Sequence, residues 1–384
     1  MTKNNVALLG ATGSIGRSAT AVLSCCKERF NVPLVAARSS IDELAACAKE
    51  LNSKMALTTD DRFYRRLSAA LPQGTSALSG MEKLIEIVSS DQIDTVLCAI
   101  IGTAGIRPVL AAIEAGKTVA LASKEVMVSA GELVNAALKA NPRARLIPVD
   151  SEHSGVFQSL AGRAKDEVET IILTASGGPF RTWSADKIAN ATVAEALNHP
   201  TWSMGKKITI DSASMMNKAL ELVEAHYLFE EYHARLDVLI HPQSAVHALI
   251  ELTDGSLIAQ CAIADMKLPI AYALTYPERV ALPAGKLSLA EMGKLEFFAP
   301  DRERFPAFDF ACAAVEAGGT LPCAMNAANE VAVERFCAGE ISFGSIYRII
   351  DKVMSDWHNE PQKSLEQLDA ADAEARCKAR EVRL

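Results

Sequence analysis

A glycine-rich turn directly after an apolar run constrains this chain more than any other feature. Val6–Leu9 has the composition of a buried strand, and residues 10–16, Gly-Ala-Thr-Gly-Ser-Ile-Gly, lead into a helical pattern. Glycines there let the chain turn tightly and let backbone N–H groups approach a pyrophosphate at the amino end of a helix. The Gly-x-x-Gly-x-x-Gly spacing is a variant of the usual fingerprint, and a purely structural turn is the alternative. A place at the first strand of a βαβ unit favours dinucleotide binding.

The first 149 residues alternate short β-rich runs with amphipathic helical stretches. This alternation predicts βαβ units, a parallel sheet and right-handed crossovers. We therefore expect an α/β fold that opens with a Rossmann-like, doubly wound domain. The expected strands are Val6–Leu9, Val32–Ala36, Thr95–Ile101, Thr118–Leu121 and Arg145–Val149, and the expected helices are Gly16–Cys26, Ile41–Leu51, Met81–Ser89 and Ile106–Ala115.

The end of the second expected strand indicates which dinucleotide would bind. An NAD enzyme usually places an acidic residue there for the ribose 2′-hydroxyl. This chain offers Arg38 and the hydroxyls of Ser39 and Ser40, which suit a 2′-phosphate. Alternatively, one of the two serines caps the next helix, with Asp42 or Glu43 completing a capping box. Both can be true, because capping leaves Arg38 available, and NADP is favoured.

Composition argues against several other functions. The net charge of −8 and an aromatic fraction of 5% do not suit nucleic-acid binding. The longest apolar runs are too short to cross a bilayer, and residues 1–5 have no signal-peptide pattern. Nine cysteines without a metal-binding or Cys-x-x-Cys arrangement indicate reduced thiols in a cytosolic protein. We expect a cytoplasmic protein that binds neither nucleic acid nor membrane.

Beyond residue 149 the pattern changes. Ala245–Leu252 and Leu257–Ala262 flank a Thr-Asp-Gly-Ser turn, which predicts a hairpin in a central α+β domain. Prolines across 277–309 indicate a linker, and the last part predicts a helical bundle with helices over Phe308–Gly318, Met325–Ala338 and Ile341–Trp357. The expected division is residues 1–149 for the dinucleotide domain, 150–276 for the catalytic domain, 277–309 for the linker and 310–384 for the bundle.

Two acidic residues mark a candidate cation site at the start of the central domain. Asp150 and Glu152 follow an apolar strand in Val149–His153, which reads as extended. Carboxylates two residues apart on an extended segment point the same way and can share one hard cation. Because Asp-x-Glu is common on surfaces, this site needs a third ligand. Lys124 and Glu125, after another strand, are either a solvated pair or part of the same crevice.

Residues 211–221 offer that third ligand. A strand over Lys207–Ile210 is expected to run into a helix on which Asn217, Lys218 and Glu221 lie within one turn of each other. A solvated Lys218–Glu221 salt bridge is the alternative. The neighbouring methionines and leucine make the stretch largely apolar, and a polar cluster there favours a site.

Two loops complete the candidate site. Thr174–Phe180 is glycine-rich and follows an expected strand over Thr170–Leu173, so Ser176 and backbone N–H groups could hold a phosphate together with the 211–221 segment. In Asn198–Gly205, Trp202 and Met204 lie between a proline and a glycine, and we expect the tryptophan to be exposed. This pattern is typical of a lid that closes over a small ligand. A buried structural tryptophan is the alternative.

These motifs occur in an order that resembles one known family. They are Gly10–Gly16, Lys124–Glu125, Val149–His153, Ser176–Phe180, His199–Gly205, Asp211–Glu221 and the Leu-Ile-His-Pro-Gln-Ser of residues 239–244. Together they resemble the 1-deoxy-D-xylulose 5-phosphate reductoisomerase family over nearly the whole chain. No single motif is specific, but the combination is.

The resemblance implies a homodimeric, NADP-dependent oxidoreductase of non-mevalonate isoprenoid synthesis, which would convert 1-deoxy-D-xylulose 5-phosphate into 2-C-methyl-D-erythritol 4-phosphate. It implies Mg²⁺ or Mn²⁺ (with Co²⁺ possible) on Asp150, Glu152 and Glu221. The substrate phosphate would be bound by Ser176, Ser212, Asn217 and Lys218, the sugar would be contacted by Lys124, Ser151, Glu152 and His199, and Trp202 and Met204 would lie on the lid. The implied NADPH contacts are Thr12, Gly13, Ser14, Ile15, Ala37, Arg38, Ser39, Ser123, Glu125 and Gly205.

The chain departs from the family pattern at three places. Ala37, Arg38 and Ser39 stand where the family usually has Gly-Lys-Asn, so a cation is retained. Ser123 replaces a usual asparagine, which puts one cofactor hydrogen bond in question, and Ala175 replaces a usual glycine.

Two other functions fit part of the pattern. An aspartate-semialdehyde-type dehydrogenase also opens with Gly-Ala-Thr-Gly, but it needs a nucleophilic cysteine in a polar, glycine-rich setting, and none is present. A non-catalytic NADPH sensor would need neither a metal nor His199.

Overall fold

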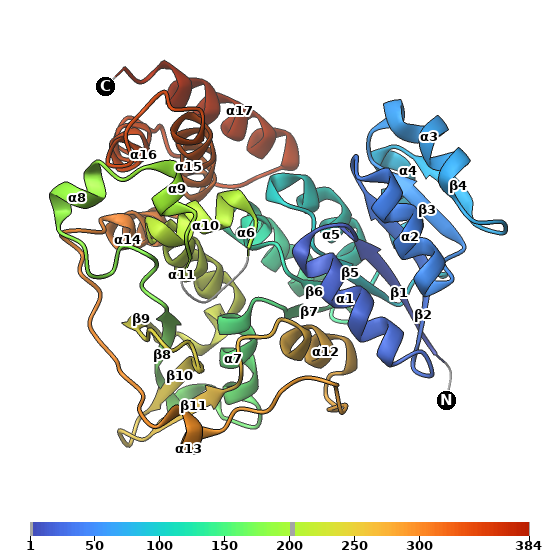
Figure 1. Cartoon of the computed structure of the whole chain (residues 1–384), viewed down its shortest axis with the longest axis horizontal. Helices are drawn as coiled ribbons and strands as arrows, with labels where there is room; N and C mark the ends of the chain where they lie inside the picture. Colours follow the sequence, from blue (N-terminus) through green and yellow to red (C-terminus); the bar gives the residue numbers. More distant parts are fainter. Residues whose placement is uncertain (1–2, 200–203, 384) are drawn as a thin grey trace. The chain divides into compact units, whose positions relative to one another are not determined.

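The computed structural model describes residues 3–199 and 204–383 (Figure 1). The chain divides into two compact units. Unit 1 comprises Met1–Val126, Val134–Ser154 and Asp265–Gly285, and unit 2 comprises Met127–Leu133, Gly155–Ala264 and Lys286–Leu384. The four-part division expected from the sequence stays a prediction.

Unit 1 is built on a parallel sheet of seven strands in the order β4-β3-β2-β1-β5-β6-β7. The order runs outward from β1 in both directions, which is the doubly wound arrangement expected. The strands are β1 (Asn4–Leu9), β2 (Phe30–Ala37), β3 (Met55–Thr58), β4 (Ser76–Ser79), β5 (Thr95–Cys98), β6 (Thr118–Leu121) and β7 (Arg145–Pro148). β3 and β4 were missed because they are short, and β5 ends three residues before the predicted Ile101.

Helices cover both faces of this sheet, as right-handed crossovers in two directions require. α1 lies beside α2 and α12, and α4 lies beside α5 (Figure 1). Their bounds are α1 (Ser14–Cys25), α2 (Ile41–Leu51), α3 (Tyr64–Ala70), α4 (Met81–Ser89), α5 (Ile106–Glu114) and α12 (Lys267–Thr275), with 3₁₀ turns η1 (Asp61–Phe63) and η2 (Gly102–Gly105). Two further helices, α6 (Lys124–Ala140) and α7 (Ser151–Leu160), contribute residues to both units.

Unit 2 contains a mixed sheet of four strands in the order β11-β10-β8-β9. The predicted hairpin is confirmed, since β10 (Val246–Leu252) and β11 (Leu257–Cys261) are antiparallel neighbours. β8 (Val168–Ala175) is antiparallel to β10 and parallel to β9 (Arg235–Ile240). Ile172, Val246 and Leu249 form a buried cluster on this sheet.

The remaining regular elements of unit 2 are helices joined by irregular segments, and α14, α15 and α16 confirm the predicted C-terminal helices. The long α15 packs against α16 and α17. The bounds are α8 (Ala185–Ala189), α9 (Val193–Ala196), α10 (Lys206–Ala213), α11 (Met216–Leu228), α13 (Leu289–Met292), α14 (Ala307–Ala317), α15 (Leu321–Cys337), α16 (Ser345–Ser355) and α17 (Leu365–Glu381), with 3₁₀ turns η3 (Lys165–Glu167) and η4 (Glu230–Tyr232). Within the described ranges, no helix is long and apolar enough to cross a membrane.

Two local predictions were wrong. Lys207–Ile210 alternates like a strand but lies in α10, because burial of Thr209, Ile210 and Asp211 on packed helices overrides the β propensity of the sequence. Val149–His153 is not extended, because α7 begins at Ser151.

Candidate active site

The glycine turn of unit 1 is shaped by close backbone contacts. Gly10 has φ +82°, and a Cβ on it would lie 2.3 Å from the Ala99 carbonyl oxygen. A Cβ on Gly16 would lie 2.3 Å from the Gly10 carbonyl oxygen. Only glycine fits at both places, so the turn brings α1 against the ends of β1 and β5 as a dinucleotide-binding turn requires.

The amino end of α1 fits a pyrophosphate. Gly13 is the N-cap and provides no side-chain hydrogen bond to the first turn. The first N–H groups of a helix have no partner within the helix, so those of Ser14 and Ile15 are suited to an anion. Thr12 precedes them, and its carbonyl accepts a 2.7 Å hydrogen bond from Arg17. The turn therefore presents backbone donors that suit the cofactor phosphates.

The end of β2 leads into three exposed polar residues that precede α2. Ala37 is buried, whereas Arg38, Ser39 and Ser40 are exposed beyond the strand. Ser40 is the N-cap of α2, but its side chain makes no capping hydrogen bond, so the alternative interpretation of a capping box is wrong. Arg38 and the serine hydroxyls thus stand at the strand end where a ribose 2′-substituent is recognised.

The ends of β6 and β7 carry a buried ion pair. Lys124 is 6% exposed, and its Nζ lies 2.7 Å from Asp150 Oδ2. Ser123 donates a 3.1 Å hydrogen bond to the Glu125 carboxylate, and both residues are buried. Lys124 and Glu125 are therefore not a solvated pair. A lysine and a carboxylate at the carboxyl ends of neighbouring parallel strands lie where ligands of such sheets bind.

The Asp150–Glu152 segment begins a helix. Asp150 precedes α7, and Glu152 lies in its first turn and accepts a 2.6 Å hydrogen bond from the Ser151 hydroxyl. Alternation along a strand therefore cannot be the reason for these carboxylates to share a cation. Hard carboxylate oxygens remain the donors that Mg²⁺ and Mn²⁺ prefer.

Unit 2 presents the third predicted ligand on α11. Glu221 is 1% exposed and Lys218 is 3% exposed, and the two form an ion pair. Asn217 donates a hydrogen bond to the other Glu221 oxygen. The solvated salt bridge considered from the sequence is therefore wrong. Burying two charged side chains carries a desolvation penalty, and the mutual attraction of Lys218 and Glu221 offsets part of that penalty.

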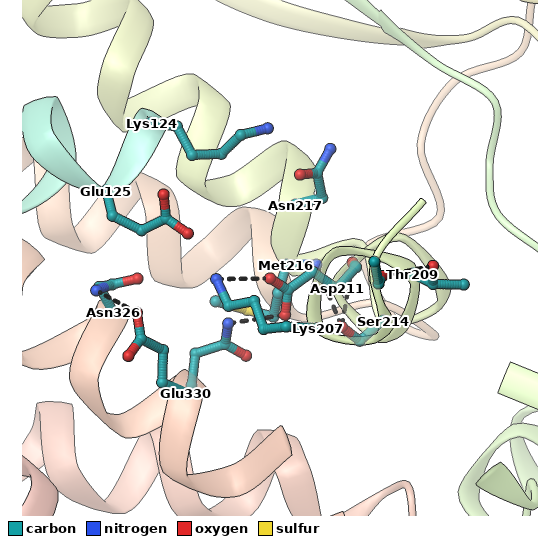
Figure 2. A network of polar contacts seen from close by, with 12 residues as sticks. Lys124, Glu125, Lys207, Thr209, Asp211, Ser214, Met216, Asn217, Asn326 and Glu330 are labelled. Carbon is teal, nitrogen blue, oxygen red and sulfur yellow. Dashed lines mark hydrogen bonds and ion pairs between the residues drawn. The ribbon is translucent and has the colours of Figure 1, made fainter. Parts of the chain in front are cut away.

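The turn between α10 and α11 is fixed by a buried polar network (Figure 2). Asp211 is 1% exposed and accepts from Asn329 Nδ2 at 2.9 Å and from Lys207 Nζ at 2.8 Å. Ser214 Oγ donates to the Asp211 carbonyl at 3.2 Å and accepts from the Met216 N–H at 3.4 Å. This network joins α10 to α15, and it places Ser212 and Asn217 on either side of one rigid turn.

Asn329 and Asp211 were not predicted as site residues. Asp211 was noticed only as the start of a motif. Asn329 lies in α15 within an alanine-rich stretch. The sequence signal that could have identified it is the pair Asn326 and Asn329, two buried asparagines in an otherwise apolar part of this helix.

Removing the Asp211 carboxylate should destabilise unit 2. Asp211→Ala removes an acceptor of Asn329 and the carboxylate that pairs with Lys207, and we expect a loss of about 2–3 kcal/mol in the free energy of unfolding. Urea denaturation measures it. Asp356→Ala is the matched control, because its ion pair with Lys352 is exposed and should contribute less than about 1 kcal/mol. Equal stability of the two variants would contradict the role of the network.

The glycine-rich loop after β8 lines a cavity of about 420 Å³ in unit 2. Ser176 and Gly178 lie in its wall, together with Arg181, Trp183 and Asn198. A Cβ on Gly178, which has φ +65°, would lie 2.6 Å from the Ser212 carbonyl oxygen. The loop therefore packs directly on the α10–α11 turn at Ser212, and the role of Ser176 and Ser212 in binding a phosphate stays a prediction.

His199 is the last described residue before the 200–203 gap. Its Nε2 lies 3.2 Å from Ser176 Oγ, and partial burial lowers the pKa of the imidazole. The lowered pKa favours the neutral ring at pH 7, whose Nε2 can accept from or donate to the Ser176 hydroxyl. Met204 is half-buried and Gly205 is the N-cap of α10. Trp202 lies outside the described residues.

The fold and these sites define an α/β enzyme with a dinucleotide turn, buried carboxylates and a second glycine-rich loop. Family models agree: one described as 1-deoxy-D-xylulose 5-phosphate reductoisomerase matches residues 6–131, and two for C-terminal domains of that enzyme match 146–229 and 261–378. The chain therefore belongs to the 1-deoxy-D-xylulose 5-phosphate reductoisomerase family.

Individual relatives and solved structures agree along the whole chain. The reductoisomerase of Protochlamydia amoebophila is 44% identical over 99% of this chain and 98% of its own length. That of Geotalea uraniireducens is 48% identical over 92% and 91%. The structure of the Zymomonas mobilis enzyme in complex with NADPH has a TM-score of 0.92 and 42% identity, covering 98% of both chains. A reductoisomerase structure with NADPH, fosmidomycin and magnesium has a TM-score of 0.90 and 40% identity, covering 98% of this chain and 97% of the other.

Proposed function

We propose that this protein uses NADPH and Mg²⁺ or Mn²⁺ to rearrange and reduce 1-deoxy-D-xylulose 5-phosphate to 2-C-methyl-D-erythritol 4-phosphate, a step of non-mevalonate isoprenoid synthesis. The observation that carries this proposal is the identity of 44% with a reductoisomerase over 99% of the chain. Members of the family have been solved with NADPH and with magnesium. Neither an aspartate-semialdehyde dehydrogenase nor a sensor accounts for that likeness.

NADPH would lie across the carboxyl edge of the unit 1 sheet. The α1 amino end, with Thr12, Gly13, Ser14 and Ile15, would bind the pyrophosphate. Arg38 and Ser39 would bind the 2′-phosphate next to Ala37, and Ser123, Glu125 and Gly205 would contact the rest of the cofactor. The Gly10 backbone, which leaves no room for a Cβ, supports this placement.

Asp150, Glu152 and Glu221 would hold the cation. When bound, NADPH supplies a hydride and the cation polarises a ketone and its neighbouring hydroxyl. Asp150 forms an ion pair with Lys124, and Glu221 forms one with Lys218. With a cation bound by all three carboxylates, the two lysines would limit the repulsion among them, and Lys124 would donate to a substrate oxygen.

The substrate phosphate would be bound by Ser176, Ser212, Asn217 and Lys218. Hydroxyl and amide donors with one buried ammonium suit an anion without a basic surface, consistent with the net charge of −8. Ser151, Glu152, Lys124 and His199 would contact the sugar. A neutral His199 can exchange a proton with a sugar hydroxyl or with Ser176. Trp202 and Met204 would exclude water from the closed site.

Following NADPH absorbance on addition of 1-deoxy-D-xylulose 5-phosphate tests this proposal. We expect oxidation with Mg²⁺ or Mn²⁺, and its loss when the metal is chelated with EDTA. NADPH binding without turnover under both conditions would contradict the proposed reaction.

We also propose that two copies of the chain associate in the cytoplasm. β11 is an edge strand whose Leu257 is 56% exposed, and Phe297 and Phe298 are also exposed in the single chain. Unpaired edges and apolar surface favour association. Light scattering should give twice the 41.1 kDa of one chain. The nine free cysteines suit a reducing compartment.

A further inference from the structure

A second arginine stands beside Arg38 at the carboxyl edge of the unit 1 sheet. Arg62 lies in η1, which follows β3 after a two-residue link, and its side chain is 79% exposed. Its Nε donates to Asp60 Oδ1 at 2.8 Å, and its Nη2 donates to Asp60 Oδ2 at 2.6 Å. Asp60 also accepts from the Arg62 backbone N–H at 3.2 Å. The side chain is therefore held in one orientation by a two-point contact.

Thr58 ties this turn to the loop that carries Arg38. β2 and β3 are parallel neighbours, with Ala37 opposite Thr58. The Thr58 hydroxyl lies 2.6 Å from the Arg38 carbonyl oxygen and 3.2 Å from the Asp60 carbonyl oxygen. Arg38 and Arg62 therefore leave adjacent strand ends, at the edge where the adenosine ribose of a dinucleotide binds.

We propose that Arg62 is a second ligand of the cofactor 2′-phosphate and, with Arg38, determines the preference for NADPH over NADH. This inference rests on the proposed function, because it assumes that the dinucleotide lies on the carboxyl edge of the sheet.

The ion pair with Asp60 leaves Arg62 able to bind a phosphate. A guanidinium has five N–H donors, and the contacts with Asp60 use two of them, leaving three. Arginine often binds two anions in this way because its fork is planar and rigid. Arg62 and Arg38 together lower the pKa of Asp60 to about 2, so Asp60 stays ionised and keeps the guanidinium in place at neutral pH. The alternative is an exposed ion pair with no further role, and the experiment separates the two.

Binary cofactor binding tests the inference without turnover. NADPH and NADH are titrated into the protein and followed by nicotinamide fluorescence, and adenosine 2′,5′-bisphosphate is titrated by calorimetry. For Arg62→Ala we expect roughly tenfold weaker binding of NADPH and of the bisphosphate, with NADH unchanged. Arg62→Lys keeps the positive charge but not the planar fork, so its NADPH affinity should lie between that of the unaltered protein and that of Arg62→Ala.

Arg29→Ala is the matched control. Arg29 directly precedes β2 at the opposite edge of the same sheet and forms an ion pair with Glu278 at 2.6 Å. Arg29→Ala removes the same charge from unit 1 and should change neither the affinity for NADPH nor the affinity for NADH. Unchanged NADPH binding in Arg62→Ala, or an equal loss for NADPH and NADH, would overturn the inference while the proposed function stands. If the unaltered protein bound NADPH no better than NADH, the proposed use of NADPH would itself be wrong.

Discussion

Glu221→Gln is expected to reduce metal-dependent oxidation of NADPH by about a thousandfold or more, because losing a charged cation ligand removes several kcal/mol of charge stabilisation. The substitution keeps the shape of a side chain that is 1% exposed, so the amide can still occupy the same space. Steady-state rates across a range of Mg²⁺ and Mn²⁺ concentrations measure the effect. Excess metal should restore little of the rate, because an amide oxygen is a much weaker ligand than a carboxylate.

The substitution also leaves Lys218 without its buried carboxylate partner, so a stability loss must be separated from a loss of chemistry. NADPH affinity and the melting temperature of the variant provide that separation. Glu330→Gln is the matched control, since Glu330 is a partly buried carboxylate of unit 2 that pairs with Arg376 at 2.6 Å. It should melt earlier but turn over normally. A Glu221→Gln variant that retained metal-dependent turnover would remove Glu221 from the proposed ligands.

Gly10→Ala is expected to abolish NADPH binding and to destabilise unit 1 by at least about 3 kcal/mol, because strain at positive φ adds to a steric clash. The new Cβ would lie 2.3 Å from the Ala99 carbonyl oxygen and 2.5 Å from its carbon. Relieving that overlap must separate β1 from the end of β5, and α1 would then move away from the pyrophosphate site. Calorimetric titration with NADPH and urea denaturation measure the two effects.

Gly74→Ala isolates the contribution of backbone conformation. Gly74 has φ +90°, close to the +82° of Gly10, but a Cβ there meets no atom within 4 Å. Its substitution should cost only about 1–2 kcal/mol and leave NADPH binding intact. If Gly74→Ala and Gly10→Ala were equally damaging, the close packing of the glycine turn would not be what forms the cofactor site.

The sequence was most informative about unit 1. Its βαβ alternation depends on local periodicity, so α2 and α4 were predicted with the bounds that the structure has, and the glycine turn was placed correctly after β1. Short strands such as β3 and β4 carry too few residues for alternation to stand out. The capping box considered as an alternative is absent at Ser40, because a serine before a helix indicates only that its side chain could cap the helix, and Ser40 makes no such hydrogen bond.

The candidate site in unit 2 shows why the rest could not be predicted. The Lys-Ile-Thr-Ile of residues 207–210 is a strand by propensity, but Thr209, Ile210 and Asp211 are buried among packed helices, where Asp211 also accepts from Asn329, 118 positions away. Such a contact leaves no local pattern. The burial of Lys218 and Glu221 is likewise set by the surrounding helices, so an exposed salt bridge and a buried site looked alike in the sequence.

Hydride transfer onto the rearranged carbon skeleton is the most direct test of the proposed reaction. The protein is incubated with Mg²⁺, 1-deoxy-D-xylulose 5-phosphate and NADPH carrying deuterium at the transferable position of the nicotinamide, and the product is examined by NMR and mass spectrometry. We predict 2-C-methyl-D-erythritol 4-phosphate with carbon-bound deuterium, formed in proportion to the NADPH oxidised. An unbranched reduced sugar phosphate, or a branched product without deuterium, would contradict the proposed function.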